Sequence, residues 1–165
     1  MLMATGATRG GVDFLVIALL SLAAVGAALV SQHVFDMQPC PWCVLQRVIF
    51  LGIAVACGIG LLWRGATGRA FSAGLAFVLA LLGIAAALWQ HFQAAASTSC
   101  NLTLADKIVS RWMHLDSMAP DVFEARASCA DAAVNLLGVP YDFWSLGLFA
   151  VLTVALVRIL QDWRR

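Results

Sequence analysis

Two cysteines at the start of an apolar segment carry the clearest chemistry in this sequence. Cys40 and Cys43 enclose Pro41 and Trp42 in a CPWC motif, and Arg47 follows one helical turn after the second cysteine. Proline is favoured in the first turn of a helix, so we expect a helix to begin here with its partially positive end at the two sulfurs. That helix end and a nearby cation both stabilise a thiolate. The motif therefore predicts a redox-active dithiol.

Three other interpretations of the CPWC motif are open. A thioredoxin-like fold also uses CPxC, but it needs a soluble βαβ context that is absent here. A zinc site would need a second close pair of ligands, and Cys100 and Cys129 are 29 positions apart, so we expect no metal site. A structural disulfide that braces a loop is the stronger alternative. Closing so short a ring removes little chain entropy, which favours a redox role.

The composition predicts a membrane protein. The chain has 165 residues, of which 62% are hydrophobic and 12% charged, and its mean hydropathy is +0.91. Soluble domains are about 45–50% apolar and about 25% charged. The formal net charge is +1, and the chain has no basic run, which argues against a nucleic-acid partner. The expected surroundings of the chain are therefore a lipid bilayer.

Four apolar segments are each close to the ~20 residues that a helix needs to cross ~30 Å of hydrocarbon. We expect helices at about residues 14–35, 44–63, 71–89 and 144–160. The predicted fold class is all-α: one membrane domain over residues 1–165, an integral four-helix bundle with a long outer loop at about 90–143. The first segment is interpreted as a retained helix, because it is long for a signal-peptide core and is preceded by few basic residues.

The basic residues predict the orientation of these helices. Six arginines fall in short segments on one side of the membrane: Arg9, Arg64, Arg69, Arg158, Arg164 and Arg165. The positive-inside rule places both termini in the cytoplasm. The CPWC motif and the long loop then face outward, into the periplasm if the source is a Gram-negative bacterium.

This orientation puts four cysteines in an oxidising compartment. Cys40, Cys43, Cys100 and Cys129 lie on the outer side, where disulfides are expected. Four cysteines allow three connectivities, and the sequence alone does not decide among them. Cys57 lies within the second apolar segment and is interpreted as a small apolar residue.

The long loop contains a predicted short amphipathic helix. Thr103 and Asp106 form a capping-box pattern, and four apolar residues after it share one helical face: Leu104, Ile108, Trp112 and Leu115. Pro120 is expected to end this element. The helix is predicted to lie on the outer leaflet or, alternatively, to pack on the loops of the bundle itself.

The sequence resembles the DsbB family, disulfide-bond formation protein B, along nearly its whole length. The resemblance rests on C-P-W-C-x3-R from Cys40 to Arg47, on the outer loop with Cys100 and Cys129, and on G-V-P-x3-W-S-L from residue 138 to residue 146. It implies a multi-pass enzyme of the bacterial inner membrane, a quinone-dependent protein-disulfide oxidoreductase. Such an enzyme reoxidises a periplasmic DsbA-like thiol oxidase and passes the electrons to a membrane quinone, here expected to be ubiquinone.

The resemblance also implies roles for individual residues. It pairs Cys40 with Cys43 and Cys100 with Cys129, and it matches Arg47 and His91 to residues near the quinone. Reduced partner would attack Cys100. Cys129 would then attack Cys40, and Cys43 would leave as a thiolate beside the arginine. The alternative for Arg47 is a cation that merely extends to the lipid headgroups.

Two other functions are considered for the whole chain. One is a non-enzymatic four-helix membrane protein whose disulfide-braced outer loop binds a partner. The other is a quinone reductase resembling vitamin K epoxide reductase, although that family usually places its active CxxC late in the helical order.

Overall fold

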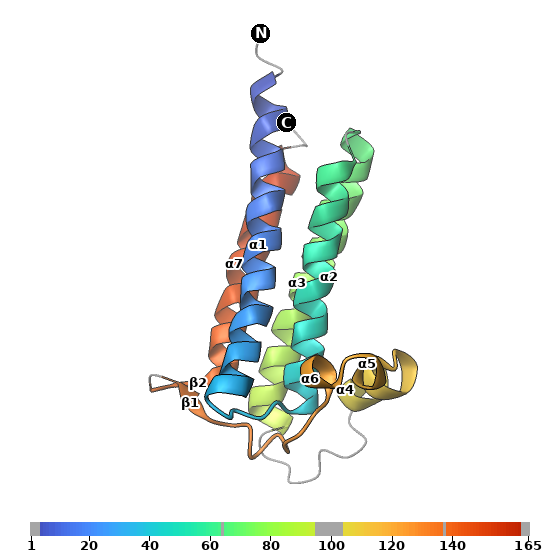
Figure 1. Ribbon diagram of the computed structural model, residues 1–165. Coiled ribbons are helices and arrows are strands. Elements are labelled where there is room, and N and C mark those ends of the chain that lie inside the picture. Colours follow the sequence, from blue (N-terminus) through green and yellow to red (C-terminus); the bar gives the residue numbers. More distant parts are fainter. Residues whose placement is uncertain (1–3, 64, 95–103, 137, 163–165) are drawn as a thin grey trace.

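The computed structural model describes residues 4–63, 65–94, 104–136 and 138–162. Four long helices dominate it: α1 (Ala4–Val34), α2 (Pro41–Leu62), α3 (Ala66–Trp89) and α7 (Tyr141–Asp162). They run side by side, and α1 begins at the end of the bundle where α7 ends (Figure 1). Each contains an apolar stretch long enough to cross a membrane. The predicted all-α membrane bundle is confirmed.

Each long helix begins before its predicted apolar range, and α7 also ends after it. α2 begins at Pro41, as its proline predicted, and α7 begins at Tyr141 with Asp142 in its first turn. α3 likewise takes in Arg69 near its start. Apolar composition predicts the part of a helix that lies in hydrocarbon, whereas backbone hydrogen bonds continue through the polar turns at each end.

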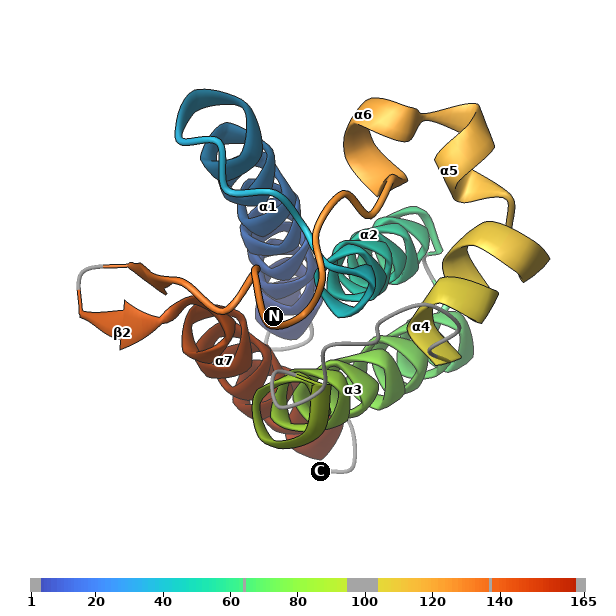
Figure 2. The ribbon, with the colours of Figure 1, turned by 90° about the horizontal axis from the view of Figure 1, so that it is seen from below.

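Small side chains bring the helices together. α2 packs against α1 and α3, and α3 packs against α7, whereas α1 and α7 contact each other much less (Figure 2). The buried face of α3 is formed largely by small residues: Ala73, Ala76, Ala80 and Gly83. A Cβ at Gly83 would lie 2.4 Å from the Phe149 ring, so this close approach requires glycine. The Phe149 ring stacks on Phe50, with ring centroids 4.0 Å apart.

The outer surface of the bundle is apolar. Large hydrophobic side chains are exposed along all four long helices, including Leu19, Val55, Phe71, Leu82 and Val151. In water, such a surface would drive association, whereas lipid tails solvate it. The exposed side chains therefore fit a bundle that is surrounded by lipid.

The remaining elements lie at the end of the bundle where α2 begins (Figure 1). A π-helical turn, η1 (Gln90–Ala94), follows α3. Three short helices and a second π-helical turn come next: α4 (Leu104–Asp106), η2 (Lys107–Trp112), α5 (Leu115–Met118) and α6 (Pro120–Phe123). A hairpin of β1 (Asn135–Leu136) and β2 (Val139–Pro140) leads into α7, and Gly138 in its turn has φ 81°.

The predicted amphipathic helix is shorter than expected. It runs as α4 and η2 only to Trp112, because His114 adopts a left-handed conformation with φ 50° before α5 begins. Its buried residues are Ala105 and Val109, and the two segments pack against α2. The predicted continuation of one helical face to Leu115 is therefore wrong.

Two details of this loop also differ from the sequence pattern. Pro120 begins α6 and does not end the preceding helix, since proline fits the first turn. Leu104 and Trp112 are exposed, so part of the predicted apolar face remains free of protein contacts. The predicted cap at Thr103 lies outside the described residues.

Candidate functional site

The two cysteines of the CPWC motif lie at the N-terminal end of α2. Cys40 is the N-cap residue, and its sulfur accepts a hydrogen bond from the backbone N–H of Cys43 at 3.3 Å. The two Sγ atoms are 2.8 Å apart, and both residues are free thiols in this structure. Cys40 is fully buried, whereas Cys43 is partly exposed. The partially positive helix end therefore favours a thiolate at this pair.

The loop after α6 returns to the start of α2. The backbone N–H groups of Arg126 and Ala127 donate to the carbonyl oxygen of Pro39 at 3.0 and 3.2 Å. This anchor lies two residues before Cys129, whose side chain is buried in the structure. The loop thereby carries the third cysteine to the dithiol.

Cys129 is hydrogen-bonded to Cys40. This hydrogen bond, a further one to Cys43, and burial raise the pKa of Cys40 well above its ordinary value, because each favours the protonated thiol. Three of the four predicted redox cysteines therefore lie together. Cys100, the fourth, lies outside the described residues.

Arg47 lies one turn after Cys43 and is only 5% exposed. Its Nη1 donates to Gln32 Oε1 at 2.7 Å and to the Val122 carbonyl at 2.8 Å, and its Nη2 donates to the Ala28 carbonyl at 3.3 Å. Its buried Nε has no hydrogen-bond partner among the described residues. The side chain is thus fixed between α1 and the outer loop and does not extend to the lipid headgroups.

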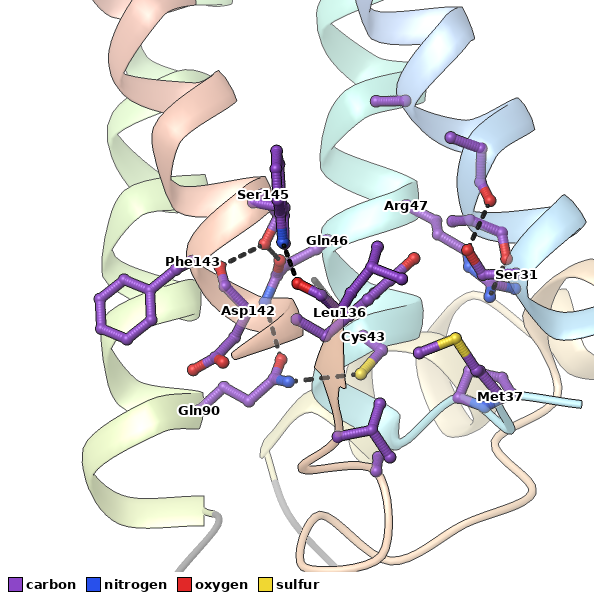
Figure 3. A pocket seen from close by; sticks show the side chains of 18 of the residues that line it. Ser31, Met37, Cys43, Gln46, Arg47, Gln90, Leu136, Asp142, Phe143 and Ser145 are labelled. Carbon is purple, nitrogen blue, oxygen red and sulfur yellow. Dashed lines mark hydrogen bonds between the residues drawn. The ribbon is translucent and has the colours of Figure 1, made fainter. Parts of the chain in front are cut away.

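A cavity of about 1060 Å³ lies between α1 and α7, beside Cys43 (Figure 3). Near the dithiol its lining is polar: Cys43, Gln46, Arg47, Gln90 and Ser145. Further along α1 and α7 the lining is small or apolar: Ala24, Ala27, Phe50, Leu148 and Val151. Sites for small organic molecules typically combine an apolar wall with a few polar groups in this way.

A chain of side-chain hydrogen bonds crosses this polar end (Figure 3). The Ser145 hydroxyl contacts Gln46 Oε1 and also the Asp142 carbonyl at 2.9 Å. Gln46 Nε2 donates to Gln90 Oε1 at 2.8 Å, and Gln90 Nε2 donates to Cys43 Sγ at 3.3 Å. This series of hydrogen bonds therefore links α7, α2 and η1 to the sulfur of Cys43.

Comparison with known proteins gives a consistent match. The family model described as "Disulfide bond formation protein DsbB" matches residues 12–159. The chain belongs to the DsbB family. Relatives named "Disulfide bond formation protein B" include those of Cupriavidus metallidurans, 31% identical over 87% of this chain and 88% of the relative, and Ralstonia nicotianae, 34% identical over 87% and 89%. "Disulfide bond formation protein B 1" of Pseudomonas savastanoi is 36% identical over 84% of this chain and 82% of the relative.

The predicted membership is thus confirmed, and the chain is a multi-pass membrane protein of a disulfide-bond-formation family. The family name implies a disulfide oxidoreductase. The lining of this cavity suits a quinone, because its apolar wall would accommodate an isoprenoid tail and its other end is lined by the polar side chains of Arg47, Gln90 and Ser145.

His91, which the resemblance associates with the quinone, does not line this large cavity. Its Nδ1 lies 2.8 Å from Asp142 Oδ2, and its ring packs against Phe92 and Phe143. It lines a smaller cavity of about 160 Å³ together with Cys129 and other residues. Its role at a quinone site therefore stays a prediction.

Several residues of this DsbB site were missed in the sequence: Gln32, Gln46, Gln90, Asp142 and Ser145. A signal was present, because Gln32 and Gln46 are amides inside segments that are otherwise apolar. Polar side chains in a membrane helix usually face protein or a cavity, where they find partners. Their partners, however, come from other helices and were not predictable from spacing along one helix.

Proposed function

We propose that this chain is a quinone-linked thiol oxidase of the bacterial inner membrane that reoxidises a periplasmic DsbA-like dithiol protein. The observation that carries the proposal is the position of the dithiol: Cys40 contacts the loop cysteine Cys129, while Cys43 lines the cavity that holds Arg47. Electrons that reach Cys40 from the loop cysteine could therefore pass through the adjacent Cys43 to an acceptor in the cavity.

The first half of the cycle is thiol–disulfide exchange. A thiolate of the reduced partner attacks the Cys100–Cys129 disulfide at Cys100 and releases Cys129 as a thiolate. The partner's second thiol then breaks the mixed disulfide, which leaves the partner oxidised and Cys100 reduced. Cys129 attacks Cys40 of the Cys40–Cys43 disulfide and releases Cys43 as a thiolate. The contact between Cys129 and Cys40 supports this step.

The second half restores both disulfides. Cys100 attacks Cys129 and releases Cys40, and the Cys40–Cys43 disulfide then re-forms with loss of two electrons and two protons. A quinone held in the cavity beside Cys43, Arg47 and Gln90 would supply the two-electron, two-proton acceptor. The Arg47 charge stabilises the Cys43 thiolate and any negative charge that develops beside it. An external acceptor is needed, because a DsbA-type oxidant has a potential of about −120 mV and few protein disulfides oxidise it.

The direct test is quinone reduction by the purified full-length protein in detergent, with a reduced DsbA-like protein as electron donor. We expect ubiquinone to be consumed in a one-to-one ratio with partner disulfide formed. Cys43→Ser should abolish consumption, because it removes the thiolate through which the electrons leave. A Cys40–Cys129 disulfide can still form in this variant, since the Cys40 thiolate can attack the Cys100–Cys129 disulfide at Cys129 and release Cys100. Absence of quinone reduction by the wild type would reject the proposal and favour a braced, partner-binding loop.

The proposed orientation has both termini in the cytoplasm and the cysteine loops in the periplasm. A membrane-impermeant thiol reagent should label a cysteine placed at the exposed Ser117 of α5 in intact cells. It should not label a cysteine placed at Thr67, near the start of α3. The reverse labelling pattern would overturn both the orientation and the periplasmic partner.

A further inference from the structure

The hydrogen-bond chain Ser145–Gln46–Gln90 ends on the sulfur of Cys43, and its direction is chemically informative. An amide has one acceptor end and one donor end. Because Gln46 receives the Ser145 hydroxyl at its oxygen, its NH2 group is directed to Gln90 Oε1. Gln90 in turn presents its own NH2 group to Cys43 Sγ at 3.3 Å.

We propose that Gln90 is a catalytic residue that stabilises the Cys43 thiolate by N–H donation, and that Gln46 and Ser145 are positioning residues that hold its amide in the donating orientation. This proposal deepens the proposed function, because it concerns the thiolate through which electrons would leave. A neutral donor aimed at an anion in a water-poor site strengthens as charge develops on the sulfur.

The placement of the two amides favours this role. Gln46 and Gln90 are 5% and 6% exposed, so their amides are removed from water and depend on each other for hydrogen bonds. Buried polar groups in such a chain are costly to leave unsatisfied. Gln90 also lies on a π-helical turn just after α3, and such turns are frequent at functional sites.

Arg47 and Gln90 act on Cys43 in different ways. Arg47 lies on the same helix as the sulfur, and its Nη atoms are occupied by Gln32 and the carbonyls of Ala28 and Val122. Its influence on Cys43 is electrostatic. Gln90 instead donates directly to the sulfur. The Ser145 hydroxyl can also turn to the Asp142 carbonyl, so only donation to Gln46 keeps the chain in the orientation that suits an anion.

The test uses full-length protein that has been fully reduced and freed of quinone, with no partner present. The rate at which iodoacetamide alkylates Cys43 at pH 7 is followed by mass spectrometry, because only the thiolate reacts. We expect Gln90→Met to slow this reaction about tenfold, because the thiolate loses its N–H donor and hydrogen bonds to charged groups are stronger than those between neutral groups. Ser145→Ala should slow it about threefold, and Ser145→Thr, which retains the hydroxyl, should restore the wild-type rate.

A double-mutant cycle between Ser145 and Gln90 distinguishes a positioning role of Ser145 from a purely structural one. If Ser145 acts through Gln90, the effect of Ser145→Ala should disappear in a Gln90→Met background. Thr153→Val is the matched control, because the Thr153 hydroxyl lies on the same helix α7 and, among the residues that the structure describes, donates to the Phe149 carbonyl of its own helix. That change should leave the Cys43 rate unaltered.

Equal alkylation rates in wild type and Gln90→Met, or additive effects in the double variant, would overturn the proposal. Helical circular dichroism checks that each variant is folded. If Gln90→Met does not fold, the Ser145→Ala and Ser145→Thr pair decides the outcome. The alkylation assay contains no quinone. A negative result in it would therefore reject the role of Gln90 and leave the proposed oxidase function standing. Conversely, a failure of the wild type to reduce quinone would reject the oxidase function without changing the alkylation result.

Discussion

Cys40 faces the outer loop, whereas Cys43 faces the cavity between α1 and α7. We call these the loop side and the membrane side of the dithiol. On the loop side, hydrogen bonds to the Cys129 and Cys43 thiols and the burial of Cys40 raise the pKa of Cys40. On the membrane side Cys43 receives the Gln90 N–H and lies near the Arg47 charge. Adjacent sulfurs on one helix turn are thus prepared for different tasks, exchange with a thiol and delivery of electrons.

This division predicts that the two half-reactions can be separated. The largest effect is expected at Arg47. Arg47→Met should lower the rate of quinone reduction about a hundredfold, since one preorganised group that stabilises developing charge contributes ~10²–10³. Arg47→Lys should keep part of the activity with a higher quinone requirement, because it retains charge but not the planar multi-donor head.

Stopped-flow absorbance of the quinone, recorded beside the rate of mixed-disulfide formation at Cys100, checks this prediction. Partner exchange should stay within about threefold of wild type in both variants, because Cys100 exchange occurs at the loop. Normal quinone affinity and rate in Arg47→Met would make Arg47 a structural tether of the loop and move the quinone site elsewhere.

A smaller effect is expected from filling the cavity. Ala27 lines it from α1, and Ala27→Phe should raise the quinone KM about tenfold while leaving thiol exchange unchanged, because the added ring occupies space beside the apolar wall. Ala23→Phe, one turn earlier on α1 and exposed, is the matched control. Equal KM values for the two variants would show that this cavity does not bind the quinone.

The smallest effect concerns the loop side. Since the hydrogen bond to Cys129 is the largest cause of the raised Cys40 pKa, Cys129→Ala should bring that pKa back toward its ordinary value. More Cys40 is then thiolate at pH 8, and its alkylation should be about fivefold faster, given that thiolate fraction changes tenfold per pH unit below the pKa. Cys57→Ala is the control. Slower alkylation of Cys40 in Cys129→Ala than in the wild type would contradict the proposed effect of Cys129 on the Cys40 pKa.

The sequence predicted the bundle and the start of α2 because both depend on local properties. Apolar length sets a membrane helix, and proline with a capping residue sets its first turn. The position of Arg47 relative to Cys43 follows for the same reason, from spacing along one helix.

Contacts between distant segments were not accessible in this way. The approach of Cys129 to Cys40 is accompanied by two backbone hydrogen bonds to the Pro39 carbonyl, which any residue other than proline could donate. The hydrogen-bond chain joins residues from three separate elements. In the sequence, each glutamine by itself indicates only a polar residue in or beside an apolar segment. His91 shows the converse: a residue named by family resemblance lies beside the smaller cavity with Asp142.

The separation of the loop and membrane sides is tested most directly by mapping disulfides during one turnover. Quinone-free oxidised protein is mixed with reduced partner, quenched with acid, alkylated and digested, and the disulfide-linked peptides are identified by mass spectrometry. We expect a Cys40–Cys129 disulfide, with Cys43 recovered as the alkylated thiol. Recovery of Cys43 in a disulfide with a loop cysteine, with Cys40 free, would contradict this expectation.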